Sequence, residues 1–217
     1  MALDTPLTWS VVIPVKVLAL AKSRLAGLEN ADRRALALAM AVDTVAAAVA
    51  CPLVGAVVVV TDDDAVTSEA SALGAETIAD SPGAGLNRAL ITGAEHAAAR
   101  WPGYGLAALL ADLPALSAAE LTTALLAAAA FPQAYIADAA GSGTTLYTAR
   151  PEAAFSPRFG PGSRALHREA GATELDAPKD SGLRQDVDTI ADLCSATAIG
   201  LGRRSAPLAT AIAASRC

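Results

Sequence analysis

The pattern of apolar and polar positions along this chain predicts strands that are each followed by a helix. Short runs of β-branched and aliphatic residues at 9–15 and 56–61 are typical of strands buried on both faces. Longer stretches at 31–50 and 86–100 carry small and aliphatic residues at helical spacing. The repeated order of strand and helix predicts a mostly parallel sheet with helices on both faces.

Further strands and helices follow from local signals. We expect strands at 75–79 and 105–111, with a Gly/Pro loop at 80–85 between them. An acidic turn at 62–64 would open one helix, and Asn30 would cap the helix at 31–50. Ser117, with Glu120 three residues later, has the spacing of a capping box and predicts a helix that runs to about Ala130.

After Gln133 the elements become shorter. The sequence predicts strands at 133–138 and 144–149, a Gly/Pro loop at 159–163, a short helix ending near Ala170 and a strand-like piece before Asp186. The segment from Gly200 carries little pattern, and its structure is left open. Since no internal repeat or linker interrupts the chain, we expect residues 1–217 to form a single domain.

Composition limits the class of partner. The 217 residues are 53% hydrophobic and 18% charged, as in a globular protein. A net charge of −6 argues against a broad nucleic-acid surface, although it allows a local phosphate site. Each apolar stretch is too short or too interrupted to span a membrane. The 3 cysteines lack metal-type spacing and the first residues lack a signal-peptide pattern, so we expect a cytoplasmic protein with a small-molecule partner.

Three aspartates are candidate ligands for a hard cation. Asp112 follows an apolar run and would stand at the carboxyl edge of the sheet, where open α/β sheets bind ligands and where Mg²⁺ can bridge to a phosphate. Asp186 and Asp188 alternate along an extended segment and could share one face toward the same cation. The alternatives are a turn through Pro114 capped by Asp112, and two solvated carboxylates.

The loop after the first strand gathers positive charge. Lys16, Lys22 and Arg24 could wrap a triphosphate and neutralise charge that grows during attack at phosphorus. A solvated basic turn is the alternative. The chain contains neither a P-loop motif nor, after this strand, the glycine fingerprint of a dinucleotide site.

Glycine-rich segments supply further candidates. The loop before the helix at 86–100 contains Gly85, which would let the backbone approach a flat ligand, and Asn87, which could bond a base edge. The segments at 141–145 and 159–164 combine glycines with hydroxyls, including Thr145 and Ser163, and together could form an anion site. Plain turns and a plain helix start remain the alternatives. Among the histidines, His96 is interpreted as surface structure and His167 as a neighbour of the anion loop.

Eight motifs spread over residues 10–193 resemble one known family. They are VVIPVK, AKSRL, GLNRA, ADLPAL, GTTL, FGPGSR, H-x-x-AGA and DVDTIADL. In this order they resemble the guanylyltransferases of coenzyme F420 biosynthesis, which act on phosphoenolpyruvate or 2-phospho-L-lactate. The resemblance implies a three-layer α/β/α sandwich with a mostly parallel sheet, the GT-A-like nucleotidyltransferase fold. The related molybdenum-cofactor guanylyltransferases are disfavoured, because the first loop lacks their glycine-rich LxGGxSxRxG form.

The resemblance also implies roles for individual residues. GMP would pass from GTP to the phosphate of the acid, and pyrophosphate would leave. The implied positions are Asp112, Asp188 and Asp186 for Mg²⁺, Lys16, Lys22 and Arg24 for the GTP phosphates, Gly85 and Asn87 for guanine, and Thr145, Gly160 and Ser163 for the acid. Lys16, Lys22, Arg24 and Asp112 would be the catalytic set. No protein nucleophile or general base is needed, because a phosphate monoester is already a dianion near neutral pH.

Two points stay open at the level of sequence. One is whether the protein turns GTP over or only binds it as a sensor. A third alternative, a nicotinamide dehydrogenase, is disfavoured by the missing glycine fingerprint. The other is the acceptor, for which the alanine-rich composition suggests a high-GC, actinobacteria-like source and favours phosphoenolpyruvate over 2-phospho-L-lactate. The oligomeric state is also open, and the product would pass to the next enzyme of the pathway.

Overall fold

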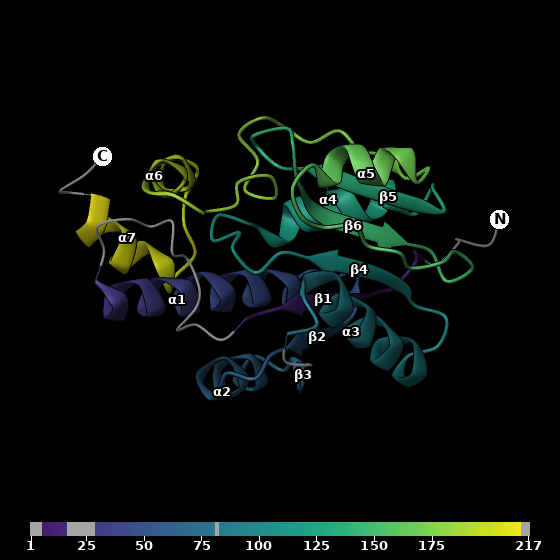
Figure 1. Ribbon diagram of the computed structural model, residues 1–217, viewed down its shortest axis with the longest axis horizontal. Coiled ribbons are helices and arrows are strands. Elements are labelled where there is room, and N and C mark those ends of the chain that lie inside the picture. Colours follow the sequence, from purple (N-terminus) through teal and green to yellow (C-terminus); the bar gives the residue numbers. More distant parts are fainter. Residues whose placement is uncertain (1–5, 17–28, 81–82, 214–217) are drawn as a thin grey trace.

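A seven-stranded sheet forms the centre of the molecule (Figure 1). The computed structural model describes residues 6–16, 29–80 and 83–213, so Lys22 and Arg24 lie outside the described residues. The strand order is β3-β2-β1-β4-β6-β5-β7. The strands are β1 (Trp9–Pro14), β2 (Val54–Val60), β3 (Glu76–Ile78), β4 (Gly105–Leu109), β5 (Gln133–Ala137), β6 (Thr144–Ala149) and β7 (Thr173–Glu174).

Strand direction brings several strand ends to one edge. β1 pairs in parallel with β2 and β4, and β2 pairs in parallel with β3. β6 runs antiparallel to both β4 and β5, because the connection at 138–143 is too short for a parallel crossover. The carboxyl ends of β1, β2, β4 and β5 therefore meet at one edge, which we call the carboxyl rim. The predicted mostly parallel sheet is confirmed.

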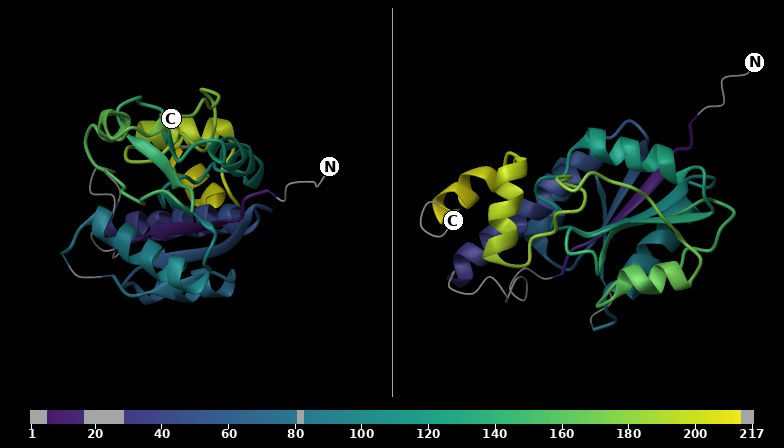
Figure 2. Two further views of the ribbon diagram at one scale, coloured as in Figure 1. Left: turned by 90° about the vertical axis from the view of Figure 1, so that its right-hand side faces the viewer. Right: turned by 90° about the horizontal axis from the view of Figure 1, so that it is seen from above.

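Helices cover both faces of the sheet, as Figures 1 and 2 show. They are α1 (Asn30–Val49), α2 (Asp64–Ala72), α3 (Leu86–Arg100), α4 (Ala118–Ala128), α5 (Ser163–Glu169), α6 (Ile190–Ile199) and α7 (Ser205–Ala213). Apolar side chains of α1, α2 and α4 pack on the face that carries Val11 and Ile13. The opposite face carries Val12 and packs against α3. The predicted three-layer sandwich is confirmed, and burial on both faces explains the unbroken valines of β2.

The last two helices pack on α1 rather than on the sheet. Leu36 and Met40 of α1 form a small core with Val187, with Leu193 of α6 and with Ala209 of α7. The buried Asp43 carboxylate in α1 also accepts the backbone N–H groups of Arg204 and Ser205, at 3.0 and 2.7 Å. Asp43 thereby satisfies donors at the start of α7 that the helix itself leaves unpaired. This places α6 and α7 beside α1 at one end of the molecule (Figure 1).

Two helix-start predictions have different outcomes. The capping box of α4 is confirmed, since Ser117 Oγ accepts the N–H of Glu120 and the Glu120 carboxylate accepts the N–H of Ser117. The predicted Asn30 cap is wrong, because the cap position of α1 is Glu29 and the Asn30 side chain accepts from Arg33 instead. None of the described helices has the length and apolar character needed to cross a membrane.

The strand-like piece predicted before Asp186 is the two-residue strand β7, which pairs in parallel with β5. Residues 181–188 form turns and irregular backbone, and their polar groups pair with side chains and with single backbone groups rather than with a strand ladder. Glu120 Oε1 accepts the hydroxyl of Ser181 at 2.7 Å and the N–H of Gly182 at 2.8 Å. Glu120, which belongs to the capping box of α4, therefore also fixes this segment.

Candidate active site at the carboxyl rim

The structure brings the predicted aspartates to one place on the carboxyl rim. Asp112 lies three positions after the end of β4, and its carbonyl accepts the N–H of Val187 at 3.1 Å. Val187 is fully buried, whereas Asp186 and Asp188 on either side of it are only partly buried. This alternation agrees with the prediction that the two carboxylates share a face.

Helix α1 fixes the backbone on both sides of Asp112. The buried Thr44 hydroxyl accepts the N–H of Leu113 at 3.2 Å and lies within hydrogen-bond distance of the carbonyl of Ala111, at 3.1 Å. A β-branched residue inside a helix has few rotamers, so this hydroxyl is well placed to hold one geometry. Asp112 thus lies in a loop whose backbone is anchored to α1 on both sides.

Negative charge is concentrated around Asp186. Burial, together with the neighbouring carboxylates of Asp112, Asp138 and Asp188, raises the pKa of Asp186 to about 7. A set of carboxylate oxygens matches the preference of a hard cation such as Mg²⁺. Among the described residues no three His, Cys, Asp or Glu side chains already form a metal cage, so substrate oxygens and water would have to complete the coordination.

Asp138 is a site residue that sequence reasoning missed. Its carboxylate accepts the N–H groups of Ser142 and Gly143, at 2.9 and 2.8 Å. The amides of this glycine-rich turn, which we expected to bind an external anion, are therefore occupied by a carboxylate of the chain itself. Asp138 could have been found from its position as the last residue of the strand predicted at 133–138.

The segment that carries Asp186 is tied to β5 and β6. The buried Thr145 hydroxyl donates to the carbonyl of Leu183 at 2.6 Å. Arg184 donates from its guanidinium to the carbonyls of Ala137 and Asp138, at 3.2 and 2.9 Å. Thr145 thus has a partner within the protein, and its contact with the acid stays a prediction. Arg184 had no sequence signal, because its partners are backbone carbonyls far along the chain.

The two glycine-rich segments lie against each other, as predicted. Arg164 donates its backbone N–H to the carbonyl of Ser142 at 3.2 Å and its guanidinium to the carbonyl of Gly141 at 2.9 Å. Ser163 is buried as the first residue of α5. Gly160 precedes it at φ = 131°, a conformation that side chains other than glycine rarely adopt. Gly160 and Ser163 thus stand next to the turn that Asp138 organises.

His167 is a buried, neutral link in the same region. Its Nε2 accepts the N–H of Arg158 at 2.9 Å, and its Nδ1 lies 3.0 Å from the hydroxyl of Thr144. The ring stacks on Tyr147 with 4.7 Å between ring centroids. Burial and the nearby charge of Arg158 lower the pKa of His167 to about 4. His167 therefore holds loop 155–163 in place without carrying charge at neutral pH.

The predicted nucleotide residues occupy the same edge where they are described. Lys16 is exposed just beyond the end of β1. Gly85 is the N-cap of α3, and Asn87 lies in its first turn. The Asn87 carboxamide is bonded to the backbone of Phe159, so the start of α3 touches loop 155–163.

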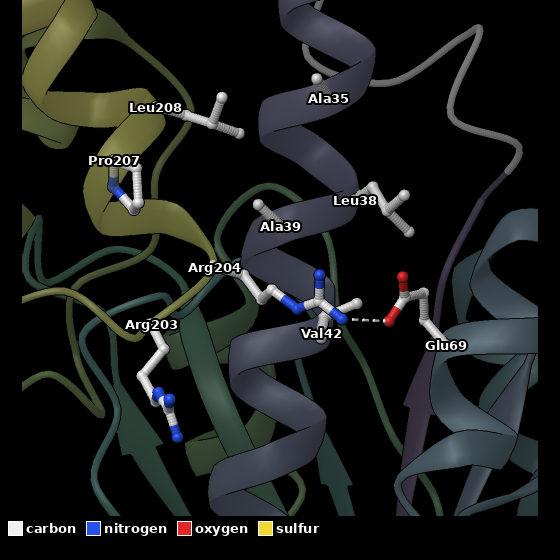
Figure 3. Close-up of a pocket in the computed structure, with 9 residues that line it drawn as sticks. All are labelled: Ala35, Leu38, Ala39, Val42, Glu69, Arg203, Arg204, Pro207 and Leu208. Atoms are coloured by element: carbon white, nitrogen blue, oxygen red, sulfur yellow. Dashed lines mark hydrogen bonds and ion pairs between the residues drawn. The ribbon is translucent and has the colours of Figure 1, made fainter.

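A separate groove of about 450 Å³ lies between α1, α2 and α7 (Figure 3). On one side Arg204 pairs with Glu69 at 2.7 Å. The lining residues are Ala35, Leu38, Ala39, Val42, Glu69, Arg203, Arg204, Pro207 and Leu208. None of the predicted site residues is among them, so the groove is distinct from the carboxyl rim site.

The fold is that of the nucleotide-diphospho-sugar transferase-like nucleotidyltransferases. A solved structure from Desulfovibrio desulfuricans G20, described as a nucleotide-diphospho-sugar transferase, matches with a TM-score of 0.73 over 95% of each chain at 17% identity. The family model described as "Guanylyl transferase CofC like" matches residues 9–205. The chain belongs to this family of guanylyltransferases.

Curated relatives agree over nearly the whole length. A phosphoenolpyruvate guanylyltransferase of Thermomonospora curvata is 55% identical over 206 residues, which cover 95% of this chain and 90% of the relative. One of Streptomyces coelicolor is 54% identical, covering 93% of this chain and 95% of the relative. The family and its relatives are enzymes, which confirms the expected guanylyltransferase and removes the support for a GTP sensor.

Proposed function

We propose that this protein transfers GMP from GTP to the phosphate of phosphoenolpyruvate, forming enolpyruvoyl-2-diphospho-5'-guanosine and pyrophosphate in coenzyme F420 biosynthesis. Membership of the guanylyltransferase family and the names of its relatives support the reaction and the acceptor. The structural observation that carries the proposal is the hydrogen bond from Val187 N–H to the Asp112 carbonyl, which joins the two aspartate segments at one rim. We further propose that the reaction takes place in the cytoplasm.

The reaction needs only an exchange of bonds at one phosphorus. An oxygen of the acid's phosphate attacks the α-phosphorus of GTP, while the bond from that phosphorus to the bridging oxygen of the β-phosphate breaks. Pyrophosphate leaves with the electron pair. Lys16, Lys22 and Arg24 are proposed to lie along the GTP phosphates, where fixed cations stabilise charge that grows on the leaving group.

A divalent cation is proposed to bind at the acidic part of the site. Asp112, Asp186 and Asp188 would hold Mg²⁺, and its charge would neutralise phosphate oxygens of the bound substrates. The pKa of Asp186 is raised first by burial and then by three neighbouring carboxylates, and a bound cation would offset their mutual repulsion. The role of the protein's own residues is to keep the carboxylate oxygens of the three aspartates together at the carboxyl rim.

The two substrates are proposed to contact different elements of the protein. Gly85 and Asn87, at the start of α3, are proposed to lie beside guanine. Thr145, Gly160 and Ser163 are proposed to surround the acid, which carries a phosphate and a carboxylate and therefore needs several donors in a compact space. Because Asp138 already occupies two amides of the neighbouring turn, donors from loop 155–163 should contribute most.

The test is to incubate purified protein with GTP, Mg²⁺ and either phosphoenolpyruvate or 2-phospho-L-lactate, and to follow pyrophosphate release and product mass. We expect one pyrophosphate for each guanylylated enolpyruvate product, with phosphoenolpyruvate the better substrate by kcat/KM. Preference for 2-phospho-L-lactate would refute the acceptor. Absence of product with both acids would refute the reaction.

A further inference from the structure

One side chain joins the proposed nucleotide site to the proposed acid site. The Asn87 carboxamide donates from Nδ2 to the carbonyl of Phe159 at 2.9 Å, and Asn87 Oδ1 accepts the N–H of Phe159 at 2.8 Å. Both polar groups of the amide thus pair with both backbone groups of a single residue. The reverse orientation would face donor against donor and acceptor against acceptor, so this pairing fixes the amide in one state.

The paired residue is anchored in the core. The Phe159 ring is buried and packs edge-on against His167, with 5.4 Å between ring centroids. The preceding residue, Arg158, donates its N–H to Nε2 of His167. Two consecutive backbone N–H groups are therefore held by side chains from two helices, Asn87 of α3 and His167 of α5.

The anchored pair leads directly into the proposed acid loop. Gly160 follows Phe159, and its carbonyl accepts the N–H of Ser163 at 3.0 Å. The direction of the chain at Gly160 is thus set by the bond from Asn87 to Phe159. On the other side, Asn87 lies two positions after Gly85, the N-cap of α3. A shift of the first turn of α3 would move the peptide group of Phe159 with it.

We propose that Asn87 is a positioning residue that couples the two substrate sites, so that binding of GTP at the start of α3 orders loop 155–163 for the acid. This inference rests on the proposed function for the identity of the two ligands. The carboxamide keeps one hydrogen and one lone pair beyond its bonds to Phe159, so a contact with guanine is compatible with it. The coupling acts through the backbone of Phe159.

Coupling between two ligands is reciprocal, which makes it measurable without turnover. The probes are phosphoenolpyruvate and a GTP analogue with a methylene bridge between the α- and β-phosphates, which cannot release pyrophosphate. Calorimetry gives the Kd of each ligand alone and with the other saturating. In the wild-type protein we expect each ligand to tighten the other by about tenfold.

Asn87→Ala removes both bonds to Phe159, and Asn87→Asp places a carboxylate oxygen against the Phe159 carbonyl. We expect both variants to lose the mutual tightening and to raise the KM for the acid about tenfold. Because Asn87 is also proposed to lie beside guanine, the Kd of the analogue alone should rise as well, so the coupling is read as the ratio of each ligand's Kd without and with the other saturating. Far-UV circular dichroism and Tm check that each variant is folded, and Asn87→Asp serves if Asn87→Ala does not fold.

Gln133→Ala is the matched control. Gln133 lies at the opposite end of the sheet, and its side-chain amide donates to the carbonyl of Ala154 at 2.5 Å. The substitution therefore removes a side-chain amide bond to the backbone next to loop 155–163, at a point away from the carboxyl rim. It should leave the coupling unchanged. The inference is overturned if wild-type protein shows no mutual tightening, or if the Asn87 variants retain it. Lack of product in the wild type, with coupling intact, would refute the proposed reaction alone.

Discussion

At the scale of single residues, the position of Asp112 is decided by its surroundings rather than by its own motif. The Thr44 hydroxyl of α1 contacts the backbone on both sides of Asp112, and the Asp112 carbonyl accepts the N–H of Val187. The carboxylate of Asp112 also contributes to the raised pKa of Asp186. These contacts hold Asp112 close to Asp186, and the action of its carboxylate on phosphates stays a prediction.

Asp112→Asn tests this role. The substitution keeps the shape of the side chain and removes one negative charge, so the fold should survive while kcat falls roughly 100-fold or more, as is typical when one charge-stabilising group is lost. In the wild type, added Mg²⁺ should also raise Tm, because a ligand that binds only the folded state stabilises it, and the variant should lose most of that rise.

Glu95→Gln provides the control for charge alone. Glu95 is exposed in the middle of α3 and makes only a weak 4.0 Å ion pair with Arg88. Steady-state kinetics and thermal melts with and without Mg²⁺ should be unchanged for Glu95→Gln. Near-normal turnover by Asp112→Asn would show that its carboxylate is dispensable.

At the scale of elements, the turn between β5 and β6 is shaped by an internal anion. Asp138 accepts two of its amides, and a Cβ atom added at Gly143 would lie 2.3 Å from Asp138 Oδ2. This distance is far below van der Waals contact, so the carboxylate must move. Since Arg164 ties the turn to α5, the displacement should reach Ser163.

Gly143→Ala should therefore raise the KM for the acid about tenfold or more, leave the KM for GTP nearly unchanged, and lower the free energy of unfolding by roughly 1–3 kcal/mol. Steady-state kinetics with each substrate varied, and urea unfolding, give these values. Gly103→Ala is the matched control, because Gly103 has φ = 89° in the turn before β4, at the other edge of the sheet. It should cost stability without changing the KM for the acid, and equal effects of the two variants on that KM would argue against the positioning role.

At the scale of the whole molecule, stability should depend on pH through His167. Its folded pKa is about 4, below its usual value of 6.5, mainly because of burial. Between these values the unfolded chain binds the extra proton and the folded protein does not. The stabilisation from keeping His167 neutral is therefore complete above pH 6.5 and is lost progressively as the pH falls toward 4.

In thermal melts from pH 8 to 4, the Tm of the wild type relative to that of His167→Gln, which cannot titrate, should be level above pH 6.5 and should fall as the pH drops toward 4. Asp186, whose pKa is raised to about 7, acts in the opposite sense over the same range, but it is present in both proteins and cancels in this comparison. If the variant does not fold, the titration of the imidazole in the wild-type protein, followed by NMR, gives the same information. A midpoint near 6.5 would contradict the buried, neutral assignment.

The sequence by itself determined the order of strands and helices as far as α5, the capping box at Ser117, and the set of candidate carboxylates and glycine loops. It could do so because hydrophobic periodicity, helix-end chemistry and the position of a residue after a buried strand are local properties. The strands at 9–15, 56–61 and 144–149 were recognisable because short runs rich in β-branched and aromatic residues favour strands.

Only the tertiary structure decided which polar groups pair. It showed that the Asp138 carboxylate accepts the amides of the turn we expected to bind an external anion. It also showed that the Asn87 side chain hydrogen-bonds the backbone of Phe159, and that Asp43 caps α7 near the end of the chain. Nothing local distinguishes these partners, because a carboxylate or amide can accept or donate to any backbone group that comes near. Which group comes near depends on how the sheet is ordered and how the helices pack on it.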